Sequence, residues 1–304
     1  RASACYTSPL LDYIMAMGAI NFGCLLTGTV YLLATLPGYL PSNNPLMGGN
    51  PSKLIIQQEG LPTDFEINHL ATLYWLDCNG FMTTAALQLL SVGALCRETT
   101  LLRLYVVVFT LFIFFGFGVD LLFPVVPGKG IDPFVVFMSM VLVAPLILGV
   151  LCHRARDEHS QLEKSWLKRA YKLQGMLWLI IEIIDWLPAF MPAFGGSPES
   201  LLHVWSAGDY KFDRYGMHIE MTSEFFGLQI AVFTIMMGML SADMLLLRIW
   251  GSWLVICQLY ETFILWAWGA RSSESGCLPA MPALIVLLST WVIMLVGIVG
   301  SLRC

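Results

Sequence analysis

The chain is a succession of long apolar stretches separated by short polar segments. The apolar residues do not alternate with polar ones, so the pattern favours helices over a β-barrel. A helix of about 20 apolar residues is long enough to cross a hydrocarbon core of about 30 Å. We therefore predict eight transmembrane helices, over residues 10–36, 67–95, 101–123, 134–152, 173–193, 222–245, 246–268 and 280–302.

One segment of the chain occurs twice. Residues 93–105 read GALCRETTLLRLY, and residues 238–250, about 145 positions further on, read GMLSADMLLLRIW. Both copies cover the turn between two predicted helices, where glycine allows close helix approach and arginine reaches the lipid headgroups. We interpret the segment as structural, with a duplicated clamp for an anionic ligand as the alternative. The matching pairs are Gly93 with Gly238, Glu98 with Asp243, and Arg103 with Arg248.

The plan around each copy is the same: a long helix, a long loop, a helical hairpin, a connection with proline and a last helix. This predicts an all-α integral membrane protein of two tandem four-helix units, residues 1–152 and 173–304. An even number of helices in each unit gives the two units a parallel orientation. Residues 153–172 join them and have the pattern of a basic amphipathic helix on a membrane surface, with docking on a partner subunit as the alternative.

The charges predict the orientation. Of the 16 Lys and Arg residues, 11 fall on the side that holds both termini. Positive charge marks the cytosol, matrix or stroma side of a membrane. Only 12% of the residues are charged, 57% are apolar, and the net charge is −5, which gives no basis for nucleic-acid binding.

Several polar residues fall inside the predicted helices, where an exposed charge is costly and therefore points to function. These residues are Asp77, Asn79, Glu182, Asp185, Glu224, Gln258 and Glu261. Glu182 and Asp185 share one helix face, and Glu261 is predicted at a similar depth, so these three form a candidate proton or cation site. The alternative is that they are neutral or hydrogen-bonded between helices.

Other candidate ligands are isolated. His69, Gln88 and Gln229, with Glu182, are chemically able to bind the metal of a chlorophyll-type pigment, and lipid is the other expected cofactor. We find no metal-binding spacing of Cys and His and no catalytic motif, so we expect no enzyme activity. The eight cysteines are interpreted as packed or free thiols.

The expected function follows from these features. The chain begins at Arg1, which we interpret as the result of a removed targeting segment and which favours an organellar membrane, thylakoid or mitochondrial. We expect an accessory subunit of a photosynthetic or respiratory membrane complex, packed against lipids, other subunits and pigments. A small proton- or cation-coupled transporter is the alternative, and a lipid-modifying membrane enzyme is the third class considered.

Overall fold

Eight long helices make up most of the computed structural model, which describes residues 18–59, 61–125, 133–152, 165–200, 206–207, 211–263, 278–279 and 281–302. Each of them falls on one of the eight apolar stretches. They are α2 (Ala19–Thr35), α4 (His69–Leu95), α5 (Thr99–Leu122), α6 (Pro133–Cys152), α7 (Trp166–Asp185), α9 (Arg214–Leu240), α10 (Met244–Phe263) and α11 (Met281–Ser301). The short elements are η1 (Leu36–Tyr39), η2 (Pro45–Met47), α3 (Ser52–Gln58), η3 (Pro192–Phe194), β1 (Ser206–Ala207) and β2 (Leu278–Pro279), with β1 and β2 paired antiparallel.

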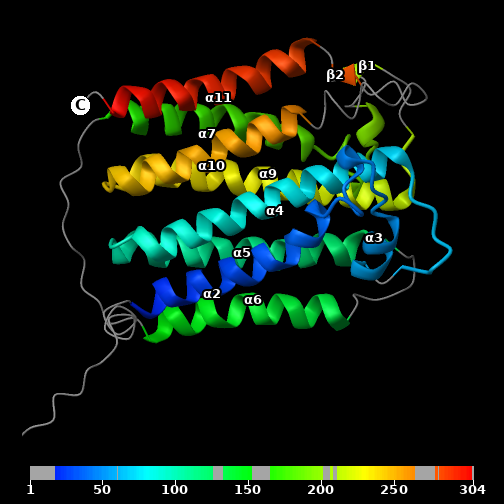
Figure 1. Ribbon diagram of the computed structural model, residues 1–304, viewed down its shortest axis with the longest axis horizontal. Coiled ribbons are helices and arrows are strands. Elements are labelled where there is room, and N and C mark those ends of the chain that lie inside the picture. Colours follow the sequence, from blue (N-terminus) through cyan, green and yellow to red (C-terminus); the bar gives the residue numbers. More distant parts are fainter. Residues whose placement is uncertain are drawn as a thin grey trace, which may run out of the picture.

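The long helices lie side by side along the longest axis (Figure 1). Helices α4 and α9 pack together in the middle, α2 packs on α4, and α7 packs on α9. Helix α6 covers α2 at one edge, and α11 covers α7 at the other. Helix α5 contacts α9, and α10 contacts α4, so each hairpin reaches across the centre. We call the end with turns 96–98 and 241–243 the turn end, and the end with α3 and η1 the loop end.

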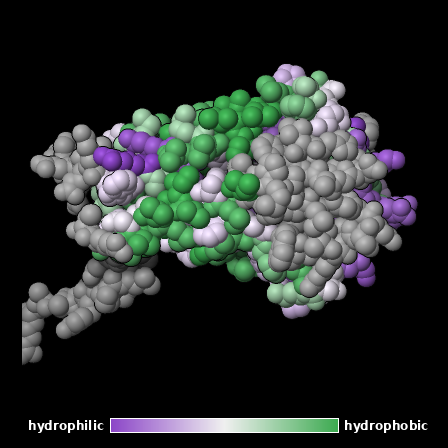
Figure 2. Space-filling model, turned by 90° about the horizontal axis from the view of Figure 1, so that it is seen from above, coloured by the Kyte–Doolittle hydropathy of each residue, from purple (hydrophilic) through white to green (hydrophobic). Residues whose placement is uncertain are grey.

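Four of these helices are long and apolar enough to cross a membrane within the described residues: Ala19–Tyr39, His69–Leu95, Thr99–Gly116 and Arg214–Leu240. On the face seen in Figure 2, apolar side chains cover the middle of the long axis, and hydrophilic ones lie toward the two ends. The fold is therefore all-helical apart from the β1–β2 pair, with the helices of a membrane-embedded protein.

Helices α4 and α9 begin and end in the same way. Asn68 accepts a hydrogen bond from the Ala71 N–H at the start of α4, and Asp213 accepts one from the Gly216 N–H at the start of α9. These side chains satisfy N–H groups that the first helical turn leaves without a partner. Each helix is 27 residues long.

The loops that follow α2 and α7 also have the same backbone structure. Six hydrogen bonds within residues 40–50 recur within residues 187–197, with Leu40 corresponding to Leu187 and every other position shifted equally. The N···O distances are 2.9 to 3.1 Å in both loops. Gly48 and Gly195 are the positive-φ residues of the described chain, with φ of 86° and 83°. The two loops thus need glycine at one corresponding position, because other residues rarely adopt this conformation.

Close helix contacts recur at the same spacing. A Cβ on Gly28 of α2 would lie 3.0 Å from the Ala86 carbonyl oxygen of α4, and a Cβ on Gly175 of α7 would lie 3.2 Å from the Ala231 carbonyl oxygen of α9. Such distances are tighter than ordinary Cβ contacts, so these glycines let the helix backbones approach closely.

The repeated segment also has structural contacts at its charged positions. Glu98 Oε1 accepts a hydrogen bond from the Ala242 N–H at 2.9 Å, so one turn binds the other. Asp243 Oδ1 accepts from Leu245 N–H at 2.9 Å and caps α10. The Arg248 guanidinium donates to Ser301 at the end of α11. Gly93 and Gly238, in turn, lie against the backbones of α2 and α7, and Arg103 is exposed on α5.

Two helices have bounds that differ from the sequence prediction by several residues. Helix α7 was expected over 173–193 but spans Trp166–Asp185, so residues 166–172 of the expected connector are its first turns. Pro188 explains the early end, because proline disfavours helix at the preceding residue. Helix α9 begins at Arg214 rather than 222, where the Asp213 cap sets the start. Residues 153–164 of the connector lie outside the described residues.

The cysteines of the described chain are free thiols. Cys24, Cys78, Cys96 and Cys257 are buried and Cys152 is exposed. This agrees with the expected packed or free thiols for these five positions. Cys5, Cys277 and Cys304 lie outside the described residues.

The matching loops give a stability prediction. Gly48→Ala and Gly195→Ala should each destabilise the protein by about 1–2 kcal/mol, because a Cβ there meets open space and only the left-handed backbone is strained. Gly49→Ala should cost more, since its Cβ would overlap the Pro41 carbonyl oxygen. Thermal unfolding of the purified protein in detergent measures these differences. A Gly195→Ala variant as stable as the parent, beside a destabilised Gly48→Ala variant, would contradict the equivalence of the loops.

Candidate proton or cation site

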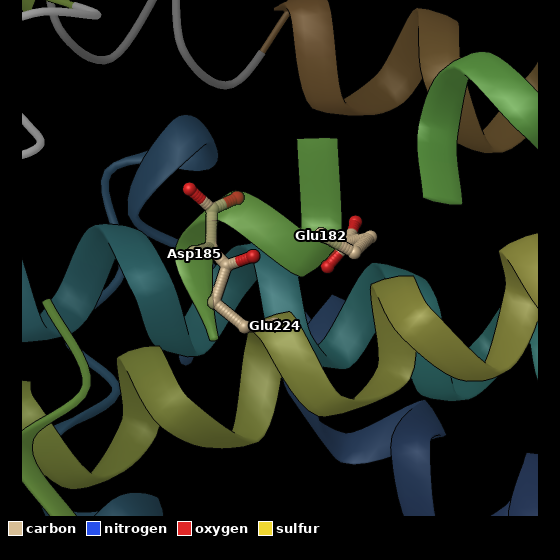
Figure 3. A group of neighbouring side chains, drawn as sticks. All are labelled: Glu182, Asp185 and Glu224. Carbon is tan, nitrogen blue, oxygen red and sulfur yellow. The ribbon is translucent and has the colours of Figure 1, made fainter. Parts of the chain in front are cut away.

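Three carboxyl groups meet where α7 packs on α9 (Figure 3). One oxygen from each of Glu182, Asp185 and Glu224 lies within 4.8 Å of the others. Glu182 and Asp185 come from the last turn of α7, and Glu224 comes from α9. Glu182 and Asp185 are buried, and Glu224 is partly buried. We call these three residues the acid cluster.

Helix geometry and one glycine bring these groups together. Glu182 and Asp185 are three residues apart, so they lie on the same face of α7. Gly227 of α9 lies beside this face, three residues after Glu224, and a Cβ there would overlap the Glu182 carboxyl group. The absence of a side chain at Gly227 therefore allows Glu182 to lie directly against the α9 backbone.

Hydrogen bonding inside the acid cluster involves protons. The Glu224 carboxyl group lies close enough to Glu182 and Asp185 to share a proton with either of them. A carboxylate has no donor, so a hydrogen bond between two carboxyl groups requires a proton on one of them. Glu182 Oε2 and Asp185 Oδ1 have no hydrogen-bond partner. The arrangement can thus hold protons, and it offers further buried oxygens to a ligand.

Three more acidic side chains surround the acid cluster. Glu220 lies one turn before Glu224 on α9 and interacts electrostatically with Asp185. Asp77 of α4 accepts a 2.6 Å hydrogen bond from the Ser223 hydroxyl. Glu261 of α10 is within electrostatic range of Asp77 and Glu182. Four helices therefore contribute acidic groups to one region.

The basic side chains of the described chain are engaged elsewhere, and Arg214, at the start of α9, donates to the Pro124 carbonyl oxygen. No described Lys or Arg forms an ion pair with any of the six acidic groups. The basic residues of α7, such as Lys168, lie near its opposite end, about 21 Å from Glu182 along the helix axis. Six carboxylates cannot all remain charged in a buried region without compensation, so protons or a bound cation must neutralise most of them.

The region lies within the helices but toward the loop end. Glu224 is ten residues into α9, which places it about 15 Å along the axis from the helix start. Glu182 and Asp185 lie at the loop end of α7, under the loop of residues 187–197.

The sequence-predicted ion-site residues are partly adjacent. Glu182 and Asp185 lie together, their third close neighbour is Glu224, and Glu261 lies outside the 4.8 Å group. Glu224 is one of the polar residues inside the predicted helices, but its sequence position did not predict contact with Glu182 and Asp185. The helix spacing of α7 against α9, which decides this contact, is not visible in the hydropathy pattern.

The proposed pigment ligands lie at different depths. His69 is the first residue of α4 at the loop end, whereas Gln88 and Gln229 are buried further along α4 and α9. His69 does not belong to the described group of His, Cys, Asp and Glu side chains able to hold a metal ion. Their assignment as pigment ligands stays a prediction.

The positions that correspond to the acid cluster in the first half of the chain carry no acids. The loop correspondence, Leu40 with Leu187, matches Thr35 with Glu182 and Gly38 with Asp185. The helix correspondence, Asn68 with Asp213, matches Asn79 with Glu224. The match is spatial as well, since a Cβ on Gly38 would lie 2.7 Å from Asn79 Nδ2. The same helix packing therefore occurs in this chain without carboxyl groups.

Comparisons with protein-family models, curated proteins and solved structures find no match to this chain.

Gly227 provides a test of this geometry. Gly227→Ala should destabilise the protein by about 1–3 kcal/mol, because the new Cβ overlaps the Glu182 carboxyl group. Adding Glu182→Ala should recover part of the loss, as a double-mutant cycle on detergent-solubilised protein would measure. Gly118→Ala in α5 is the matched control, since a Cβ there meets nothing within 4 Å. Additive effects of the two changes would contradict the direct contact.

Proposed function

We propose that this protein moves protons or cations across a membrane and that the acid cluster is its ion site. The observation that carries the proposal is the contact of Glu182, Asp185 and Glu224 where α7 packs on the membrane-type helix α9, with Asp77, Glu220 and Glu261 around them. Buried acidic groups that compensate one another through protons or cations are typical of ion pathways.

The acid-free counterpart supports a functional role for these carboxyls. Thr35, Gly38 and Asn79 fill the corresponding positions where α2 packs on α4. That pair of helices packs as closely as α7 and α9 without an acidic side chain at these positions. Stability of the packing therefore does not require Glu182, Asp185 and Glu224, and their burial is costly.

We also propose that the chain is two tandem four-helix units with eight membrane spans, in parallel orientation. Supporting observations are the matching loops 40–50 and 187–197, the paired glycine contacts and the paired caps Asn68 and Asp213. The helix contacts follow the same plan when α2, α4, α5 and α6 are matched with α7, α9, α10 and α11. For example, the contacts of α2 with α4 and α6 correspond to those of α7 with α9 and α11.

The turn end is proposed to face the cytosol, matrix or stroma. Exposed basic side chains there include Arg97, Arg103, Arg169 and Lys172, whereas the loop end carries the exposed acids Asp64 and Glu66. This distribution supports the orientation expected from positive charge. An organellar membrane is the proposed location.

A role as an accessory subunit of a larger membrane complex is the second candidate. The observation that favours it is the broad apolar surface of α7, where Leu173, Met176, Leu177, Ile180 and Ile183 are exposed. Lipid or another subunit would cover such a surface. Migration of the native protein with a large complex would support this role, and migration as a monomer or small oligomer would oppose it.

The transport proposal is tested in liposomes that contain the purified chain. Glu182→Gln with Glu224→Gln should reduce potential-driven flux of protons or cations to the level of empty liposomes, because the amides keep the shape but not the charge or proton affinity. Dyes inside the liposomes measure pH and Ca²⁺. The matched control is Thr35→Val, which alters the corresponding buried position of the first half and should retain full flux. Equal flux in the double variant and the parent would refute the proposal.

Orientation is tested with single cysteines on the two ends. In a variant whose native cysteines are replaced, a cysteine at Arg97 should react with an impermeant reagent only from the cytosol, matrix or stroma side. A cysteine at Lys53 should react only from the other side, because Arg97 lies in a turn-end connection and Lys53 in α3 at the loop end. Labelling of both from the same side, or each from the opposite side to that expected, would contradict this orientation.

A further inference from the structure

We infer that the acid cluster binds a hard divalent cation of about the size of Ca²⁺, with Glu182, Asp185 and Glu224 as its ligands. This inference rests on the proposed function and names the substrate class of the same site. The donor atoms, the number of close carboxyl groups, the unpaired oxygens and the acid-free counterpart support this assignment.

The donor atoms select the class of cation. All three close ligands are carboxyl oxygens, and the described part of the chain brings no His or Cys into the same group. Oxygen ligands suit hard cations such as Ca²⁺, Mg²⁺ and Mn²⁺, whereas zinc and copper sites favour nitrogen and sulfur.

The number of close carboxyl groups favours the larger of these cations. Ca²⁺ takes six to eight oxygen ligands in a flexible geometry, whereas Mg²⁺ usually keeps several of its waters and is bound by one or two carboxylates. Three carboxyl groups, each with an oxygen within 4.8 Å of the others, therefore suit Ca²⁺ better than Mg²⁺.

A buried acid with an unpaired oxygen points to a ligand independently of these three residues. Glu220 is only 5% exposed, its Oε2 has no hydrogen-bond partner, and it lies one turn from Glu224 on the same face of α9. It interacts electrostatically with Asp185 and Glu224, so its charge acts on the acid cluster. Burial without a partner is costly for a carboxyl group, and a nearby cation would offset that cost.

Charge and position agree with binding of a divalent ion. A cation with two charges compensates two carboxylates at once, and Glu182 Oε2 and Asp185 Oδ1 are both available to it (Figure 3). The first half, with Thr35, Gly38 and Asn79, offers no carboxylate at the corresponding place. One cation site per chain is therefore expected.

Terbium(III) is a suitable probe, because it takes the place of Ca²⁺ in oxygen sites and emits when a nearby tryptophan transfers energy to it. Trp178 hydrogen-bonds to Glu182, and Trp186 follows Asp185 directly in the chain. The full chain in detergent should give saturable, tryptophan-sensitised terbium emission. Ca²⁺ should displace terbium at lower concentration than Mg²⁺ does.

Variants separate this site from surface binding. Glu182→Gln with Glu224→Gln should weaken terbium binding by at least about tenfold, a loss typical of changes that disturb a metal site. Asp64→Asn with Glu66→Gln is the matched control, since it removes the same charge from exposed residues and should bind as the parent does. Size-exclusion profiles establish that each variant is folded. No saturable emission in the parent, or equal binding by the first double variant, would overturn the inference.

The two proposals fail in different ways. Proton flux that depends on Glu182 and Glu224, without terbium or Ca²⁺ binding, would uphold the transport proposal and overturn the divalent-cation site. Terbium binding that Glu182→Gln with Glu224→Gln weakens, without flux of any ion, would uphold the cation site and overturn transport. Absence of both ion flux and terbium binding in the parent protein would overturn the transport proposal and the cation site together.

Discussion

The close approach of α7 to α9 is the contact on which the rest of the site depends. Gly238, Gly175 and Gly227 lie in turn along this contact, and each leaves no space for a side chain of its own. The glycines hold the two helices together over their whole length and set their rotation. With that rotation fixed, the last turn of α7 faces Glu224. The acid cluster is thus a product of backbone packing rather than of attraction between its members, which repel when charged.

The same packing in the two halves of the chain serves different chemistry. Helices α2 and α4 use Gly28 and Gly93 as α7 and α9 use Gly175 and Gly238, but they enclose neutral side chains. The two halves share their helix caps, turns and close glycine contacts. They differ at a few positions, such as Asn79 in the first half and Glu224 in the second. A frame that is stable without the acids can tolerate their mutual repulsion when they are present.

Much of the fold could be predicted from the sequence, because long apolar stretches leave few alternatives to helices. The turns at 93–105 and 238–250 also stood out, since their residues match without a gap. The end of α7 was misplaced because apolar residues continue past Asp185, although Pro188 gave the necessary signal. Glu224 could not be assigned to Glu182 and Asp185, because this contact depends on the rotation of two helices about their axes.

The hydrogen bond from the Ala242 N–H to the Glu98 carboxyl group fastens the two hairpins at the turn end. The acid cluster lies toward the opposite end, the loop end, at the last turn of α7. A rocking motion of one helix group against the other that preserves this bond moves the turn end least and the loop end most. The Glu98 bond then acts as a pivot, and Asp77 on α4 and Glu224 on α9, far from it, change their separation more than residues near the turn end do.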